Sequence, residues 1–321
     1  LSNLMTEADF SYTGERFADI QLLRYRLNGF EQLSLSQKRY IYCLAKATLF
    51  GRDITFDQFG RYNLIIRKTL ETIVSDLTPD ERNEEEFQKL EVYLKRVWFS
   101  NGIYHHYGCE KFKPDFSESF FRNILNKVDA RRLPLENGET VDELADKLVR
   151  IIFDADYLPK RVNKADGEDL VMTSACNYYE GVTQQEAEDY YNALKDKAGE
   201  NAPSFGLNSR LVKRNGKLTE EVYSADALYA NAIRHIIHWL EKAREFAEND
   251  KQRDVISTLV EYYRTGDLRT FDEYSIKWVE CLEGRVDFIN GFIEVYGDPL
   301  GLKASWEGIV EYTDLEATKR T

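Results

Sequence analysis

The segment from Gly291 to Tyr312, GFIEVYGDPLGLKASWEGIVEY, constrains the fold of this chain more than any other. Two short extended runs flank a tight Gly-Asp-Pro turn. Side chains alternate between the two faces of a strand, so Glu294 and Tyr296 are expected to point the same way. The segment therefore predicts a two-stranded ribbon that presents an acid and a phenol on one face. Such a pair suits the ammonium group and a carbonyl oxygen of a peptide.

The first half of the chain favours helices joined by short loops. Apolar residues recur at helical spacing in the stretches 41–49, 64–74 and 87–98. Ser34 or Ser36 is a suitable N-cap for the first stretch, and Gly51 is a suitable end for it.

Two further helices are predicted from their first turns. Thr140 with Glu143 forms a capping box ahead of an apolar stripe, and Thr183 with Glu186 repeats the device. Each cap is expected to stabilise its helix by about 1 kcal/mol.

The character of the sequence changes between residues 165 and 224, where Gly, Asn, Ser and β-branched residues are frequent. Asn215-Gly216 between apolar runs is a strong hairpin signal. Helices are expected to resume at Ala225 and to continue to about Cys281. The fold class that these patterns predict is α+β: mostly helical, with a small sheet or barrel built from distant segments.

Composition excludes several classes of partner. A formal net charge of −13 opposes nucleic-acid binding, which needs a basic stripe. No apolar run approaches the length of a membrane span, so no membrane partner is expected.

The four cysteines show no CxxC pair, which favours free thiols in a reducing compartment, and the expected location is the cytoplasm. The chain begins at Leu1 and not at Met, so an exported or lipoprotein form stays open.

Two segments together resemble the dipeptidyl peptidase III family of zinc exopeptidases, in particular its bacterial branch. The first is 98–114, WFSNGIYHHYGCEKFKP, and the matching positions are Ser100, Asn101, Gly102, Tyr107, Gly108, Lys111, Phe112 and Pro114. In the second, 291–310, they are Gly291, Phe292, Ile293, Glu294, Tyr296, Asp298, Pro299, Gly301, Glu307, Gly308 and Val310. The resemblance extends over essentially the whole chain.

The chain departs from the family pattern at the metal site. The family carries an HExxGH zinc motif, whereas none of the four histidines here is followed by Glu. The resemblance therefore implies that 1–321 is a single lower-lobe domain. It would have a helical part at about 1–160 and a mixed strand and helix part at about 161–321. The zinc-bearing lobe would be absent, so zinc is expected in the full-length enzyme and no metal in this chain.

The resemblance also implies roles for individual residues. Tyr296 matches the family tyrosine that hydrogen-bonds the scissile carbonyl, and it is the expected catalytic residue. Glu294 matches the acid that holds the substrate's ammonium group. His106 and Tyr107 match a loop that lines the substrate cleft. The remaining expected substrate-binding residues, from the second matched segment, are Glu307 and Gly308.

Three functions are compatible with the sequence. The first is the substrate-binding lobe of a zinc-dependent dipeptidyl peptidase, whose partners are short peptides with a free N-terminus and the missing zinc lobe. The isolated lobe is expected to be inactive, to expose apolar surface and to self-associate. The second is a non-catalytic helical module for protein interaction. The third is an independent metalloenzyme that uses His235 and His238, which share a helix face but have no third ligand or general base in the sequence pattern.

Overall fold

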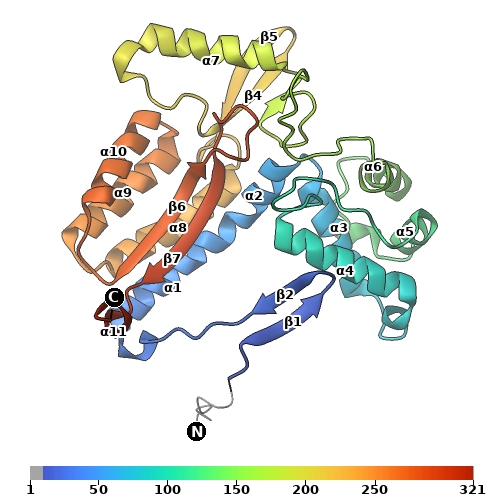
Figure 1. The fold of residues 1–321 in the computed structure, drawn as a ribbon, viewed down its shortest axis with the longest axis horizontal. Coiled ribbons are helices and arrows are strands. Elements are labelled where there is room, and N and C mark those ends of the chain that lie inside the picture. Colours follow the sequence, from blue (N-terminus) through green and yellow to red (C-terminus); the bar gives the residue numbers. More distant parts are fainter. Residues whose placement is uncertain (1–9, 321) are drawn as a thin grey trace.

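The computed structural model describes residues 10–320 and is mainly helical (Figure 1). Its helices are α1 (Leu35–Phe50), α2 (Arg52–Phe59), α3 (Asn63–Asp76), α4 (Glu85–Ser100), α5 (Glu118–Leu125), α6 (Val141–Phe153), α7 (Gln184–Ala198), α8 (Ala230–Glu245), α9 (Asp250–Thr265), α10 (Leu268–Glu280) and α11 (Leu315–Thr318). Its strands are β1 (Thr13–Phe17), β2 (Ile20–Leu23), β3 (Tyr179–Glu180), β4 (Ser209–Arg214), β5 (Lys217–Val222), β6 (Val286–Glu294) and β7 (Ser305–Tyr312). The predicted α+β class is confirmed.

The predicted caps begin their helices. The Ser34 hydroxyl accepts from the Gln37 amide at 3.2 Å, and the Gln37 side chain accepts from the Ser34 amide at 2.8 Å, at the start of α1. The capping boxes at Thr140 and Thr183 are also present, and they begin α6 and α7. Gly51 ends α1 as predicted, and the stretches 64–74 and 87–98 lie in α3 and α4.

The strands form three small separate sheets, β1-β2, β3-β4-β5 and β6-β7. Asn215-Gly216 joins β4 to β5, with Arg214 opposite Lys217, as the hairpin signal predicts. β3 pairs parallel to β4 and completes the only three-stranded sheet among the described residues. None of the three sheets closes into a barrel, so the barrel alternative is wrong within residues 10–320.

Two elements differ from the sequence prediction because contacts far along the chain decide them. The hairpin β1-β2 lies in the part predicted to be helical, and ion pairs of Lys95 with Glu15 and of Arg96 with Asp19 attach it to α4. The helix expected from Ala225 begins instead at Ala230. Residues 223–228 bond back to one another and to β5, which keeps them out of the helix.

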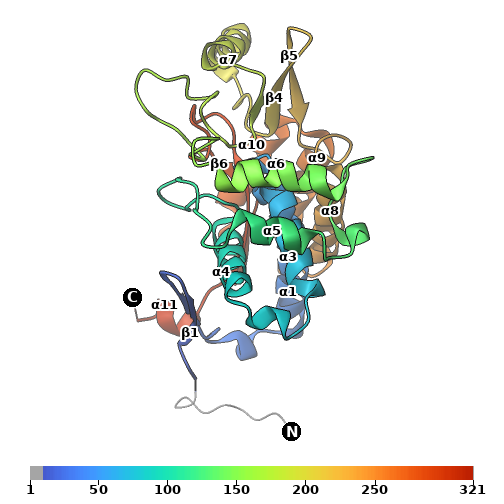
Figure 2. The same ribbon diagram turned by 90° about the vertical axis from the view of Figure 1, so that its right-hand side faces the viewer.

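The core has three parts. In the first, α1 packs against α8, α8 against α9, and the ribbon β6-β7 lies across α1 (Figure 1). The second part is formed mainly by α3, α4, α5 and α6, on the side of the molecule that faces the viewer in Figure 2. The third, smaller part lies between α7 and strands β3 and β4. The helix α2 joins the first two parts, because Ile54 is buried in one and Phe56 in the other.

Within residues 10–320, no helix has both the length and the apolar character that crossing a membrane requires.

Candidate functional site

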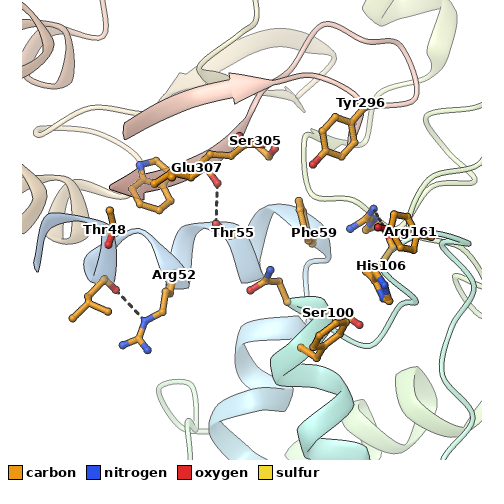
Figure 3. Close-up of a pocket in the computed structure, with 17 residues that line it drawn as sticks. Thr48, Arg52, Thr55, Phe59, Ser100, His106, Arg161, Tyr296, Ser305 and Glu307 are labelled. Carbon is orange, nitrogen blue, oxygen red and sulfur yellow. Dashed lines mark hydrogen bonds between the residues drawn. The ribbon is translucent and has the colours of Figure 1, made fainter. Parts of the chain in front are cut away.

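A cavity of about 610 Å³ lies where the ribbon β6-β7 meets the helices (Figure 3). Its walls come from the end of α1, from α2, from the last turn of α4, from the loop after α4, and from the end of the ribbon. The lining residues are Thr48, Leu49, Arg52, Thr55, Phe59, Phe99, Ser100, Asn101, His106, Tyr107, Arg161, Tyr296, Ser305, Trp306, Glu307, Gly308 and Ile309. Five of the six predicted site residues are among them.

The sixth predicted residue, Glu294, does not line the cavity. It is the last residue of β6 and is exposed, whereas Tyr296 lies beyond the strand. Strand alternation therefore does not relate Tyr296 to Glu294, because β6 ends at Glu294 and the register of the ribbon is irregular just before it. The charge of Glu294 nevertheless acts on both Tyr296 and Glu307, so the three groups lie near one another.

Glu294 and Glu307 form a negatively charged region beside Tyr296, called here the negative pole. Burial raises the pKa of Glu307 above its ordinary value, and the neighbouring charge of Glu294 raises it further. Burial also raises the pKa of the Tyr296 hydroxyl, with Glu307 and Glu294 adding to the shift and Arg161 opposing it. Tyr296 therefore keeps its proton at neutral pH and is available as a hydrogen-bond donor.

The turn that carries Tyr296 is held by Asp298, a completely buried carboxylate. One of its oxygens accepts from the amides of Leu302 and Lys303 at 2.8 and 2.9 Å, and also from the Tyr179 hydroxyl at 2.9 Å. The other accepts from the Leu300 amide at 3.2 Å. The Asp-Pro of the second matched segment therefore fixes the path of the chain between Tyr296 and β7.

The first matched segment has a structural explanation in its Asn and Gly. Asn101 ends α4 in the left-handed conformation, and Gly102 follows at a φ of 150°. A Cβ atom on Gly102 would lie 2.1 Å from the side chain of Asn63, whose carbonyl oxygen accepts from the Ile103 amide at 3.2 Å. These contacts direct the following loop toward the cavity.

The loop itself is organised by His105. Its Nδ1 accepts from the amides of Tyr107 and Gly108 at 3.2 and 3.1 Å. The ring of His106 stacks on that of His105 with centroids 4.5 Å apart, and burial lowers the pKa of His106. Lys111 anchors the end of the segment by donating to the carbonyls of Ile151, Asp154 and Tyr157. His105 and Lys111 thus position the loop, whereas His106 and Tyr107 line the cavity.

Sequence reasoning missed Arg161, which is 5% exposed and lines the cavity. Its guanidinium lies over the ring of Phe59, 4.4 Å from the centroid, and Figure 3 shows it beside His106. The backbone amide of Arg161 donates to the Cys109 carbonyl at 2.8 Å, so the residue is fixed against the loop of the first matched segment. Arg161 is 47 positions or more from both matched segments, and no local pattern marks it.

The described residues do not fit a metal site. Within residues 10–320 there is no group of three or more His, Cys, Asp or Glu side chains that could hold an ion. His235 and His238 are exposed on α8, where their rings contact Phe50 and Trp239.

Comparison with known families gives one match to the sequence. The model of a family described as peptidase family M49 matches residues 161–321. Among curated proteins, dipeptidyl peptidase 3 of Dictyostelium discoideum is 22% identical over 91% of this chain and 44% of its own length. Dipeptidyl peptidase 3 of Homo sapiens is 24% identical over 88% of this chain and 42% of its own length. The chain thus spans less than half the length of these relatives.

Solved structures resemble the fold. The structure of DPP III from Caldithrix abyssi matches with a TM-score of 0.58 and 18% identity, over 91% of this chain and 42% of that one. Dipeptidyl-peptidase III from Corallococcus sp. strain EGB matches with the same score and identity, over 92% of this chain and 42% of that one. At this level of identity, the likeness concerns the fold.

Proposed function

The chain belongs to peptidase family M49, and on that premise we propose that it is the substrate-binding lobe of a zinc-dependent dipeptidyl peptidase. The proposed enzyme removes dipeptides from the N-terminus of short peptides. The observation that carries the proposal is the cavity that gathers Tyr296 from the turn after β6, Glu307 and Gly308 from β7, and His106 and Tyr107 from the loop. Zinc is proposed to bind outside this chain, in the complete enzyme.

The acidic pole of the cavity suits the ammonium group of a peptide. Glu294 and Glu307 lie near enough for the charge of one to raise the pKa of the other, and Glu307 is half-buried. A cation between two carboxylates relieves their repulsion. Hydrogen bonds between charged partners are roughly twice as strong as neutral ones. An exopeptidase that counts residues from the N-terminus needs such a fixed anion.

The Tyr296 hydroxyl is the proposed donor to the carbonyl oxygen of the bond that is cleaved. A phenol is protonated at neutral pH, and burial and the two carboxylates move the pKa of Tyr296 further above neutrality. A donor aimed at an oxygen that gains negative charge stabilises the transition state, typically by about 3 kcal/mol.

The backbone of β7 supports binding of an extended peptide. Trp306 directs its amide and carbonyl away from β6, toward the Gln58 side chain at 2.8 Å and the Thr55 hydroxyl at 3.1 Å. Outward and inward backbone groups alternate along an antiparallel strand, so the amide and carbonyl of Gly308 also point away from β6. Gly308 lines the cavity. Main-chain hydrogen bonds at this edge would bind peptides of many sequences.

Calorimetry with matched peptides tests the proposal. We expect the 321-residue chain to bind a tetrapeptide with a free amino group at least about 10-fold more tightly than its N-acetylated form. Glu294→Ala is expected to reduce this difference and to leave the affinity for the acetylated peptide unchanged. Equal affinity of the wild type for both peptides would contradict the proposal and favour the alternative of a non-catalytic interaction module.

Hydrolysis gives a second test. The chain alone is expected not to hydrolyse dipeptidyl-naphthylamides, whereas the chain joined to a zinc lobe is expected to do so. Normal kinetics of Glu294→Ala in the joined enzyme would remove Glu294 from the mechanism.

A further inference from the structure

Arg161 is a buried cation for which the described residues supply no anion. It makes no ion pair within 4.0 Å with any described carboxylate, whereas Arg67 and Arg210, whose side chains are 13% and 16% exposed, pair with Asp53 and Glu221. Its Nη2 donates only to the carbonyl of His106 at 3.4 Å and to the sulfur of Cys109 at 3.7 Å. Its Nε is enclosed and has no acceptor among the described residues. Its hydrogen-bonding capacity is therefore largely unused.

This arrangement is costly unless something else binds there. Guanidinium groups carry five N–H donors, and a buried charge without a hydrogen-bonding partner is strongly disfavoured. The contact with Phe59 offsets only part of that cost. The aromatic ring attracts the positive charge, but it supplies no oxygen or nitrogen acceptor for the N–H groups of the guanidinium. The position is nevertheless rigid: the amide of Arg161 donates to Cys109, and its carbonyl accepts from the Cys176 amide at 3.0 Å. A fixed, underused cation in a cavity wall is a preformed site for an anion.

The half-buried carboxylate and the buried cation of the cavity are separated, whereas the exposed Arg52 lies on the same side of Phe59 as Glu307 in Figure 3. Glu307, and Glu294 beside it, form the negative pole described above, whereas Arg161 lies with the neutral rings of Phe59 and His106. In the view of Figure 3, Glu307 and Arg161 lie on either side of Phe59. Arg161 acts on Tyr296 in the opposite sense to the two carboxylates. The pKa of the Tyr296 hydroxyl is therefore raised by the two carboxylates and lowered by the guanidinium of Arg161.

We propose that Arg161 is the anion subsite of this cavity and binds a carboxylate of the bound peptide, an inference that rests on the proposed peptide-binding function. A peptide is itself a dipole with an ammonium at one end, so its carboxylates belong at the pole opposite Glu294 and Glu307. The planar guanidinium matches a carboxylate in two parallel hydrogen bonds. The carboxylate has two sources, an acidic side chain beside the cleaved bond or the free C-terminus of a short peptide.

Calorimetry with paired peptides tests the subsite on the 321-residue chain. All peptides keep a free amino group. One pair differs only in a C-terminal carboxylate or carboxamide, and the other pair carries Glu or Gln at the second or third residue of an amidated peptide. We expect the charged member of at least one pair to bind about 10-fold more tightly. Equal affinity within both pairs overturns the proposal without the need for any variant.

Variants then assign the effect to Arg161. Arg161→Met is expected to abolish the preference for the charged member and to keep the affinity for the neutral member. Arg161→Lys is expected to retain a smaller preference, because an ammonium lacks the planar fork. The matched control is Arg52→Met, which removes an exposed arginine from another part of the lining of the same cavity. A preference that survives in Arg161→Met, or that disappears in Arg52→Met instead, overturns the proposal.

The same measurements separate this inference from the proposed function. If free and acetylated amino ends bind alike, the peptidase proposal fails and the subsite fails with it. If the free amino group is required but charged and neutral peptides bind alike, only the subsite fails. Circular dichroism shows whether each variant is folded. If a variant does not fold, the affinities of the wild type for the charged and neutral peptides still test the subsite.

Discussion

Glu307 couples the chemistry of the cavity to pH. Its pKa is raised first by burial and then by the charge of Glu294, so it takes up a proton at a higher pH than an ordinary glutamate does. A protonated carboxyl no longer attracts an ammonium group, whereas the amino end of a peptide stays charged in acid. Binding of the amino end is therefore controlled on the acid side by Glu307.

We predict that affinity for a peptide with a free amino group falls as the pH is lowered through the raised pKa of Glu307. In Glu294→Gln the neighbouring charge is removed, the pKa of Glu307 falls, and the loss of affinity moves to lower pH, with weaker binding overall. Calorimetry between about pH 4 and about pH 7 measures both curves, and the N-acetylated peptide is the control. An unchanged midpoint in Glu294→Gln would show that the two carboxylates are not coupled.

Lys303 is a buried cation like Arg161, but its ammonium group has hydrogen-bond acceptors within the protein. It is completely buried, and its Nζ donates to the Tyr191 hydroxyl at 2.5 Å, to the Gly206 carbonyl at 3.2 Å and to the Ser209 hydroxyl at 3.3 Å. Burial lowers its pKa from 10.5 to about 8, although the charges of Glu220 and Asp298 oppose the shift. Unlike Arg161, Lys303 has acceptors for its donors and does not face the cavity.

The sign of its effect on stability follows from proton binding. Between the pKa of about 8 in the folded chain and 10.5 in the unfolded chain, the unfolded state binds more protons, so stability rises with pH. We predict that wild type gains about 2 kcal/mol relative to Lys303→Met between about pH 7 and about pH 9.5. Urea denaturation measures the difference, and Lys217→Met, at an exposed position, corrects for the loss of one charge. A difference that does not change with pH would place the folded pKa near its ordinary value.

The predicted residues that line the cavity lie inside local motifs, whereas Glu294 of the same motifs does not line it and Arg161 enters only through the fold. His106, Tyr107, Tyr296, Glu307 and Gly308 belong to two matched segments, and all five line one cavity. Arg161 joins them because its backbone bonds to the loop of the first segment. Pairings of this kind depend on tertiary structure, which a single sequence does not show.

At the scale of elements, helix ends were predictable because a cap depends on residues within one turn. Ser34, Thr140 and Thr183 each begin a helix through contacts three residues away. The hairpin β1-β2 was not predictable in this way, because its strands are mostly exposed and are attached to α4 through ion pairs 77 or more residues apart in sequence.

The junction of α1 and α2 supports the ribbon through a steric fit. An added Cβ at Gly51 would lie 2.2 Å from the ring of Trp306, which lines the cavity and donates its indole N–H to the Tyr263 hydroxyl at 3.0 Å. The φ of Gly51 is −81°, so the backbone itself would accept any residue. The requirement for glycine is therefore one of space.

We predict that Gly51→Ala destabilises the chain by about 1–3 kcal/mol, because the ring of Trp306 has to move within a packed core. Glycine to alanine normally stabilises by about 0.4–1 kcal/mol where the space is free, so the sign is informative. Gly297→Ala is the control, since its Cβ would meet no atom closer than 3.5 Å. Urea denaturation of both variants measures the effect. A Gly51→Ala chain as stable as the control would mean that the ring moves without cost.

For the molecule as a whole, the cavity lies where two cores meet, and both halves of the chain contribute to the core beneath the ribbon. The core beneath the ribbon contains Tyr40, Leu44 and Ile54 from the first part of the chain, together with residues from 207 to 306. Gln58 adds polar links, since its side chain donates to the Ala304 carbonyl at 3.0 Å and accepts from the Trp306 amide at 2.8 Å. The composition change near residue 165 therefore marks a change in local structure and does not separate two cores.

We predict that residues 161–321, the part that the family model matches, do not fold on their own. Losing Tyr40, Leu44 and Ile54 removes roughly 2–3 kcal/mol of apolar burial at each site, and the buried backbone around Ala304 and Trp306 loses its partners. Together these losses are comparable to the whole stability of a typical domain, about 5–15 kcal/mol. The fragment is expected to show no cooperative urea transition and no near-ultraviolet circular dichroism, and addition of residues 1–160 is expected to restore both. A cooperative transition of the fragment alone would show that the ribbon and its helices form a core without α1 and α2.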